Sequence, residues 1–282
     1  FYICKVFIRQ LMLRKIYFIL TPSGRRIARR LFYLPTDCFN ILLNRSDSLI
    51  PPKGKSFVGS GNFKNIGDKF FKHIVETTDI DTDSTILDIG SGIGRIARPF
   101  TYFLSKKSKY IGFDIIDYGI NWCNKKYKKY PNFSFECYPL KNDLYNLSAN
   151  KNASEFVFPY NDNTFNLVIL TSVFTHMQKD EVTNYLQQIF RVMKPGAYCY
   201  ATFFLILPND DQSLFPYEFE DYSLHNMKIK NANVAYKKDF IMNTIGKIGY
   251  SHFQSFEGWW KTGFKADKVD FQDVIILQKP DK

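Results

Sequence analysis

Three closely spaced glycines in residues 87–97, LDIGSGIGRIA, constrain the fold more than any other part of this sequence. An apolar strand is expected over 86–89, and a helix is expected over 92–104. Glycine lets the backbone approach a ligand closely, and the amides at a helix N-terminus attract negative or polar groups. The stretch therefore predicts a strand–turn–helix unit with a ligand site at the turn.

Strand and helix patterns alternate along the rest of the chain. Apolar residues at helical spacing predict helices over 63–78, 116–127, 182–193 and about 236–248. Apolar runs predict further strands over 110–113, 133–137, 165–170, 198–207, 251–256 and 271–277. This order is typical of an α/β fold whose parallel sheet is covered by helices on both faces.

The charge distribution separates an N-terminal arm from a main domain. Residues 1–60 carry 11 basic and 2 acidic side chains, a net charge of +9, whereas the remaining 222 residues carry 27 and 25. We therefore expect a basic N-terminal extension over 1–60 and a main domain over 61–282. Within the main domain, 208–235 break the alternation, and 208–265 are expected to form a substrate or lid insertion.

The start of the arm, FYICKVFIRQLMLRKIYFIL, is apolar but interrupted by Lys5, Arg9, Arg14 and Lys15. No uncharged run approaches the ~18 residues that a membrane span needs, and the charges also break a signal-peptide core. Over these residues the charges do not gather on one helical face. We favour a pair of helices packed on the main domain; docking at a membrane surface or on a lipid-linked substrate, and a nucleic-acid arm, are the alternatives. The first residue is Phe rather than Met, which leaves open where the natural chain begins.

The cysteines give no sign of a metal site or a redox motif. Five are present, far apart, with neither a CxxC pair nor a His/Cys cluster of zinc spacing. We expect reduced cysteines in a cytoplasmic protein, peripheral to a membrane if the arm binds one, and no metal.

The residues around the glycines favour a cationic ligand over a dinucleotide. The spacing is GxGxG, with Arg95 where the dinucleotide fingerprint places its third glycine. Asp88 precedes the first glycine, and two like charges ~4 Å apart repel by roughly 4 kcal/mol at an effective dielectric constant of about 20. Asp114 ends the second predicted strand, where a carboxylate accepts hydrogen bonds from ribose hydroxyls. A nucleoside with a cationic tail, such as S-adenosylmethionine, meets both requirements.

Four segments in order, ILDIGSGIGRIA, YIGFDII, FPYNDNTFNLVILTSVFTHM and RVMKPGAYCYATFF, resemble the successive motifs of class I S-adenosylmethionine-dependent methyltransferases. The resemblance covers about 63–207, and the ending QDVIILQKP is similar to the last strand of such domains. It implies a Rossmann-like, doubly wound seven-stranded sheet with the last strand antiparallel, here with a basic helical N-terminal extension.

The resemblance also assigns the cofactor site. It implies that Asp88, Gly90, Gly92 and Gly94 hold the methionine moiety, that Asp114 and Ile115 hold the ribose, and that Thr171 and Ser172 line the methyl-transfer end. Pro139 stands where relatives often carry an acid near the adenine, so Tyr138 or the backbone around Leu140 is expected to serve instead. His176 is placed either as a general base or as a packing residue beside the cofactor. Arg95 either faces the ligand or is a surface or salt-bridging residue.

Two aromatic and basic stretches have two interpretations each. KKYKKY at 125–130 fits an RNA-binding surface, but lysines at the negative end of a helix are the commoner reason for such a run. Trp259 and Trp260 form either an aromatic substrate wall or a cap on the core.

We therefore expect methyl transfer from S-adenosylmethionine to an oxygen or nitrogen of a small-molecule, glycan or lipid-linked acceptor. An RNA methyltransferase that uses the basic arm, and a non-catalytic scaffold with this fold, are the alternatives. Nucleic acid is disfavoured because the main domain is nearly neutral.

Overall fold

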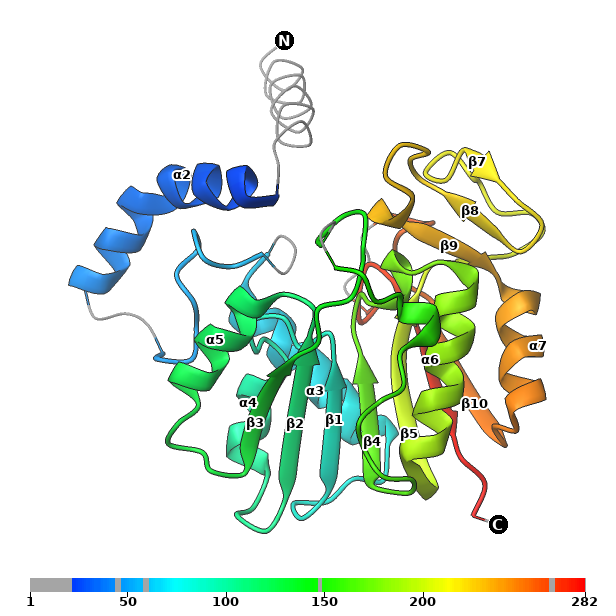
Figure 1. The fold of residues 1–282 in the computed structure, drawn as a ribbon, viewed down its shortest axis with the longest axis horizontal. Helices are drawn as coiled ribbons and strands as arrows, with labels where there is room; N and C mark the ends of the chain where they lie inside the picture. The colour runs from blue at the N-terminus through cyan, green and yellow to red at the C-terminus, as the bar shows by residue number, and fades with distance from the viewer. Residues whose placement is uncertain (1–21, 44–46, 58–60, 147–148, 264–266, 282) are drawn as a thin grey trace. The chain divides into compact units, whose positions relative to one another are not determined.

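The structure is a computed structural model that describes residues 22–43, 47–57, 61–146, 149–263 and 267–281 (Figure 1). The chain divides into two compact units, Phe1–Gly59 and Ser60–Lys282. The first part of the predicted helix pair, residues 1–21, lies outside the described residues.

In the first unit, helix α2, Pro22–Leu42, is held by the turn that follows it. The carboxylate of Asp37 accepts hydrogen bonds from the backbone amides of Lys53, at 2.7 Å, and Gly54, at 2.8 Å. The Arg29 Nε donates to the carbonyl of Lys53 at 3.2 Å. A polar side of the helix is therefore satisfied by the chain's own backbone.

The second unit is built on a seven-stranded sheet in the order β10-β11-β5-β4-β1-β2-β3. The strands are β1 Thr85–Ile89, β2 Lys109–Asp114, β3 Phe133–Cys137, β4 Phe165–Leu170, β5 Met193–Phe203, β10 His252–Phe256 and β11 Asp273–Gln278. The five strands from β1 to β5 pair in parallel, and β11 runs antiparallel to both β5 and β10. The predicted fold class, with its antiparallel last strand, is confirmed.

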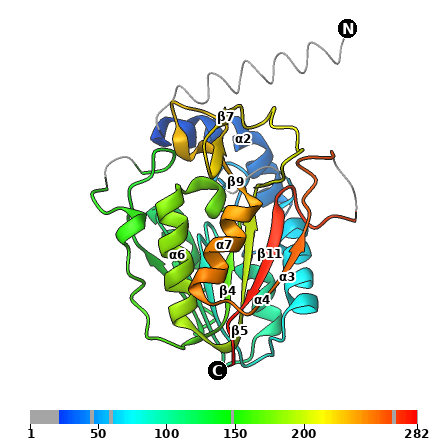
Figure 2. The ribbon, with the colours of Figure 1, turned by 90° about the vertical axis from the view of Figure 1, so that its right-hand side faces the viewer.

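Helices cover both faces of this sheet. Helices α3, Phe63–Thr77, and α4, Ala97–Phe103, lie on one face, and α6, Lys179–Val192, and α7, Lys238–Ile248, lie on the other (Figure 2). Helix α5, Asp117–Lys126, packs against β2 and β3. The central strands are buried from both sides, which explains why β1 and β4 read as continuous apolar runs rather than as alternating patterns.

The prediction of one helix over 92–104 is wrong at its start. Residues 92–96 form turns, and α4 begins at Ala97. Gly92 and Gly94 have φ values of 59° and 80°, which a right-handed helix does not accommodate. The glycines therefore extend the loop by a full turn before the helix begins.

The prediction that 198–207 form one long strand is also wrong. Strand β5 ends at Phe203, and the chain enters a second, four-stranded sheet in the order β6-β9-β8-β7. Its strands are β6 Leu205–Ile206, β7 Tyr217–Glu218, β8 Tyr222–Leu224 and β9 Val234–Lys237. This small sheet lies beyond the carboxyl ends of β4 and β5 (Figure 1).

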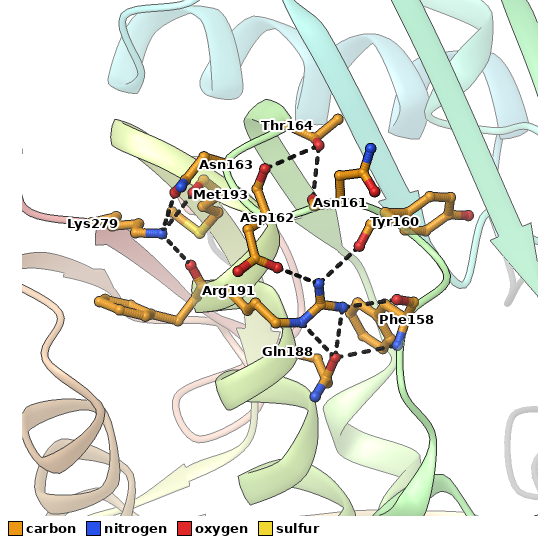
Figure 3. A network of polar contacts seen from close by, with 11 residues as sticks. Phe158, Tyr160, Asn161, Asp162, Asn163, Thr164, Gln188, Arg191, Met193 and Lys279 are labelled. Atoms are coloured by element: carbon orange, nitrogen blue, oxygen red, sulfur yellow. Dashed lines mark hydrogen bonds and ion pairs between the residues drawn. The ribbon is translucent and has the colours of Figure 1, made fainter.

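At the opposite end of the large sheet, two cations fix α6 to its neighbours (Figure 3). The Arg191 guanidinium donates to the carbonyls of Phe158 and Tyr160 at 2.8 Å each, and it pairs with Asp162. The Lys279 ammonium donates to the carbonyls of Phe190 and Met193, also at 2.8 Å each. The Lys279 ammonium thus satisfies carbonyls at the C-terminal end of α6, which a helix leaves without partners, and Arg191 ties the same end to the segment before β4.

We expect replacement of Arg191 with Met to lower the free energy of unfolding by about 2 kcal/mol, because it removes charged donors from two partly buried carbonyls. The melting temperature should fall by roughly 4–8 °C. Urea unfolding measures the change in the free energy of unfolding. The matched control is Lys247→Met, at an exposed residue of α7. Equal loss in the two variants would contradict a specific role for the network.

Candidate functional site

The turn after β1 needs glycine for steric reasons. Gly90, Gly92 and Gly94 all have left-handed φ values, of 71°, 59° and 80°. A Cβ on Gly90 would lie 2.4 Å from the Val173 side chain, and one on Gly94 would lie 2.9 Å from the Tyr127 hydroxyl. The GxGxG spacing is therefore imposed by this loop, which brings backbone amides to the carboxyl ends of β1 and β2.

Asp88 is a buried carboxylate beside this turn. Its side chain is 1% exposed, and its Oδ2 accepts a hydrogen bond from the Tyr110 hydroxyl at 2.7 Å. Its Oδ1 has no hydrogen-bond partner among the described residues. Burial raises the pKa of Asp88 to about 7, the nearby Asp114 raises it further, and Tyr110 and Arg95 oppose the rise. An unpartnered buried oxygen of this kind fits a cationic hydrogen-bond donor.

Asp114 ends β2 and holds the turn in place. Its Oδ2 accepts from the Gly92 amide at 2.8 Å, and its Oδ1 accepts from the Ile116 amide, also at 2.8 Å. Burial raises the pKa of Asp114 to about 6, while the backbone amides of Ile116, Gly92 and Ile115 lower it. The carboxylate therefore holds both the backbone just before α5 and the glycine turn, and each oxygen retains capacity to accept from a ligand.

Arg95 is half-buried rather than on the surface. Burial lowers the pKa of its guanidinium, whereas Asp270 and then Asp88 raise it. The charge of Arg95 therefore faces two carboxylates.

The end of β4 carries a strained residue. Ser172 has a φ of 56°, an unusual value for a residue other than glycine. Its amide donates to the Thr202 hydroxyl at 2.8 Å, and that hydroxyl donates to the Gln272 side chain at 2.6 Å. Thr171 is half-buried at the same edge. The turn places Val173 against Gly90, so the loops after β1 and β4 adjoin.

His176 faces the small sheet's connecting segment. It lies in the short 3-10 helix η2, Phe174–His176, and its Nδ1 is 2.9 Å from the carbonyl of Asn231. Its own carbonyl accepts from the side chains of Asn231, at 2.9 Å, and Asn142, at 3.0 Å. Burial lowers the pKa of His176, although the carbonyls of Asn231 and Ala232 raise it. Sequence reasoning missed Asn142 and Asn231, because neither belongs to a local motif.

A pocket of about 390 Å³ follows β3. Its lining includes Tyr138, Pro139 and Leu140, which the sequence already placed near the adenine. The remaining lining residues were not indicated by the sequence: Asn146, Ala149, Asn150, Lys151 and Phe156. Tyr138 and Tyr160 both donate to the Glu136 carboxylate, at 2.5 and 2.9 Å. Apolar and aromatic walls of this kind fit a flat heterocycle such as adenine.

The structure decides between the two interpretations for one of the two tryptophans. Trp260 is buried, packs against Phe204 and Phe215, and donates its indole N–H to Asp273 at 2.8 Å. The substrate-wall interpretation is therefore wrong for Trp260, which caps the core. Lys125 and Lys126 lie in the last turn of α5, in accord with the helix-end reading.

The part of the chain that the structure describes holds neither a candidate metal site nor a membrane-spanning helix. No group of three or more His, Cys, Asp or Glu side chains is arranged there to hold a metal ion. No helix there combines the length and the apolar character that crossing a membrane requires. Cys38, Cys123, Cys137 and Cys199 are free thiols, and Cys4 lies outside the described residues.

Comparison with known proteins agrees with this geometry. Residues 87–201 match the family model described as a methyltransferase domain. Over these residues, which are less than half of the chain, the match indicates a methyltransferase domain.

Among curated proteins, this methyltransferase domain is similar to sterol 24-C-methyltransferase of Schizosaccharomyces pombe, with 28% identity over 137 residues. The match covers 49% of this chain and 32% of that protein, so the chain spans about a third of the relative's length.

Two solved structures are similar in fold. An S-adenosylmethionine-dependent methyltransferase from Methanosarcina mazei has a TM-score of 0.50 and 21% identity, over 74% of this chain and 98% of that one. The PH0226 protein from Pyrococcus horikoshii has a TM-score of 0.53 and 14% identity, over 80% and 94%.

We expect the stability of the ligand-free methyltransferase to fall as the pH rises from 3.8 to about 7, the range between the ordinary pKa of Asp88 and its value here. The folded protein binds a proton on Asp88 more tightly than the unfolded chain, so deprotonation favours unfolding. Asp88→Asn should flatten this slope and recover roughly 5 °C or more of melting temperature near neutral pH. Melting curves across this range test it, with exposed Asp239→Asn as control; equal slopes in all three proteins would contradict it.

Proposed function

We propose that the chain transfers the methyl group of S-adenosylmethionine to an oxygen or nitrogen of a small-molecule, glycan or lipid-linked acceptor. The observation that carries the proposal is the pair of buried carboxylates, Asp88 and Asp114, at the glycine turn. One of these carboxylates has an oxygen without a partner among the described residues. That arrangement selects a cation over a phosphate, as a sulfonium nucleoside requires.

In this proposal each part of the cofactor meets a matching group of the chain. Asp88 accepts from the ammonium group while the amides of the turn approach the methionine carboxylate. Asp114, with Ile115 beside it, accepts from the ribose hydroxyls. The pocket around Leu140 encloses the adenine. Thr171 and Ser172 adjoin the methyl-transfer end. The full set is Asp88, Gly90, Gly92, Gly94, Asp114, Ile115, Leu140, Thr171 and Ser172.

When bound, S-adenosylmethionine supplies a methyl group that is already activated for transfer by its positive sulfur. The work of the protein is then to orient the acceptor and to exclude water. Alignment of this kind contributes up to ~7–11 kcal/mol in favourable models. The small sheet, β6 to β9, stands beside the carboxyl ends of β4 and β5, where an acceptor has to approach. We assign the acceptor surface to this sheet and its connections.

One part of the proposed acceptor class is supported by the relative that matches part of the chain. That protein is named as a sterol 24-C-methyltransferase, which supports the inclusion of lipids among the candidates. An RNA methyltransferase and a non-catalytic scaffold remain distinguishable outcomes. Transfer of a tritiated methyl group into a fractionated cell extract separates them, because label in the RNA fraction would replace the proposed acceptor, and no label together with no cofactor binding would favour the scaffold.

Asp114→Asn should weaken S-adenosylmethionine binding by roughly 10–100-fold, because it removes the charge from hydrogen bonds to the ribose. Titration calorimetry measures the affinity. Asp117→Asn, three residues further along and exposed, is the matched control and should bind as the unaltered protein does. Unchanged affinity in Asp114→Asn would refute the ribose assignment.

For His176 the contacts favour a positioning role over that of a general base. Its ring faces the carbonyls of Asn231 and Ala232, so it links the loop after β4 to the small sheet. We expect His176→Asn, whose amide can replace the Nδ1–H donor, to retain methyl transfer, and His176→Ala to lose roughly tenfold. The pH–rate profile should keep its shape in both variants. Loss of the acidic limb in His176→Asn would instead identify His176 as the base.

A further inference from the structure

Helix α2 presents an apolar face to solvent. Its large apolar side chains are 55–83% exposed: Ile27, Leu31, Phe32, Leu34, Phe39 and Leu42. At the angular spacing of an α-helix these six residues fall within an arc of about 160°. An apolar stripe this wide ordinarily faces a core, so its exposure in α2 requires a partner.

The other side of the helix is already occupied by the chain itself. Asp37 and Arg29 bind the backbone at Lys53 and Gly54. A Cβ on Gly54 would lie 3.0 Å from the Cα of Arg30, so the turn packs closely on the helix backbone. These contacts fix the turn on the polar side of α2 and leave the apolar arc facing away from the turn.

The charge on α2 identifies the chemistry of the partner. Arg26, Arg29 and Arg30 lie on the polar side, and Asp37 is the one acid in the sequence of 22–42. The carboxylate of Asp37 is engaged with backbone amides, so the cations dominate the outward field. An apolar face flanked by arginines is the pattern of a helix that lies in the interface of an anionic bilayer.

We propose that α2 docks the protein on a membrane surface that contains anionic lipids, with its apolar arc among the acyl chains and its arginines at the headgroups. A second copy is a poorer partner, because association through α2 would bring together two segments that each carry +9 over residues 1–60. RNA would pair with the arginines but would leave the apolar arc uncovered. The proposal does not depend on which molecule is methylated.

The test is co-sedimentation of the full chain with phosphatidylcholine vesicles, with and without phosphatidylglycerol. We expect binding to the anionic vesicles that weakens at high salt. Arg26→Gln with Arg30→Gln should weaken it by roughly 30-fold, since each cation near an anionic surface contributes about fivefold. Leu31→Glu with Phe32→Glu should abolish it.

The control is Val157→Glu, which places a single glutamate on an apolar residue that is 65% exposed in the second unit. It should bind vesicles as the unaltered chain does. Cofactor affinity should be the same in all variants, so failure here is separable from failure of the proposed function.

Equal binding to neutral and anionic vesicles, or normal binding by the Leu31/Phe32 variant, would overturn the proposal. A lower melting temperature or a changed oligomeric state in that variant, without vesicle binding by the unaltered chain, would show that protein covers the face instead.

Discussion

The hydrogen bond from the Gly92 amide to the Asp114 carboxylate is the contact on which the geometry of the site depends. It joins the turn after β1 to the end of β2 at 2.8 Å. The amides of Gly90 and Ser91 donate to the carbonyl of Phe113, in the same neighbouring strand, at 2.8 and 3.0 Å. The glycine turn is therefore held by the adjacent strand rather than by contacts of its own. This is why a loop in a left-handed conformation can present its amides in a defined position.

This arrangement buries two carboxylates where they are poorly hydrated, and their burial has a chemical consequence. Burial raises the pKa of Asp88 to about 7 and that of Asp114 to about 6, so both protonate more readily than in water. A bound cation reverses this preference because it stabilises the ionised forms. Cofactor binding and proton release are thus coupled through the same two side chains. A phosphate in place of the cation would be repelled by the two ionised carboxylates. Protonation would relieve that repulsion only by neutralising the carboxylates.

The large sheet was predictable because its central strands are buried on both faces. Strands β1, β4 and β5 therefore consist mostly of apolar residues, which are visible in the sequence. The glycine turn was only half predictable, since its spacing indicated a ligand loop but not the left-handed backbone that delays α4 to Ala97. The small sheet was missed because strands of two to four residues carry no period. Asn231 contacts His176 across 55 residues, and no local pattern records such a pair. Trp260 was ambiguous until Asp273 supplied the acceptor for its indole.

Helix α2 shows what an amphipathic pattern leaves undetermined, namely which surface covers the apolar stripe. An amphipathic pattern predicts that the apolar stripe of a helix is buried, and in most helices the core of the same domain buries it. Here the polar stripe contacts the chain through Asp37 and Arg29, and the apolar stripe does not face that contact. The arginines then act in two ways. Their mutual repulsion opposes association of two copies through the exposed apolar face, and their attraction to negative lipid headgroups lowers the free energy of the same face at a bilayer. One set of charges thus both opposes self-association through this face and favours its burial at an anionic bilayer.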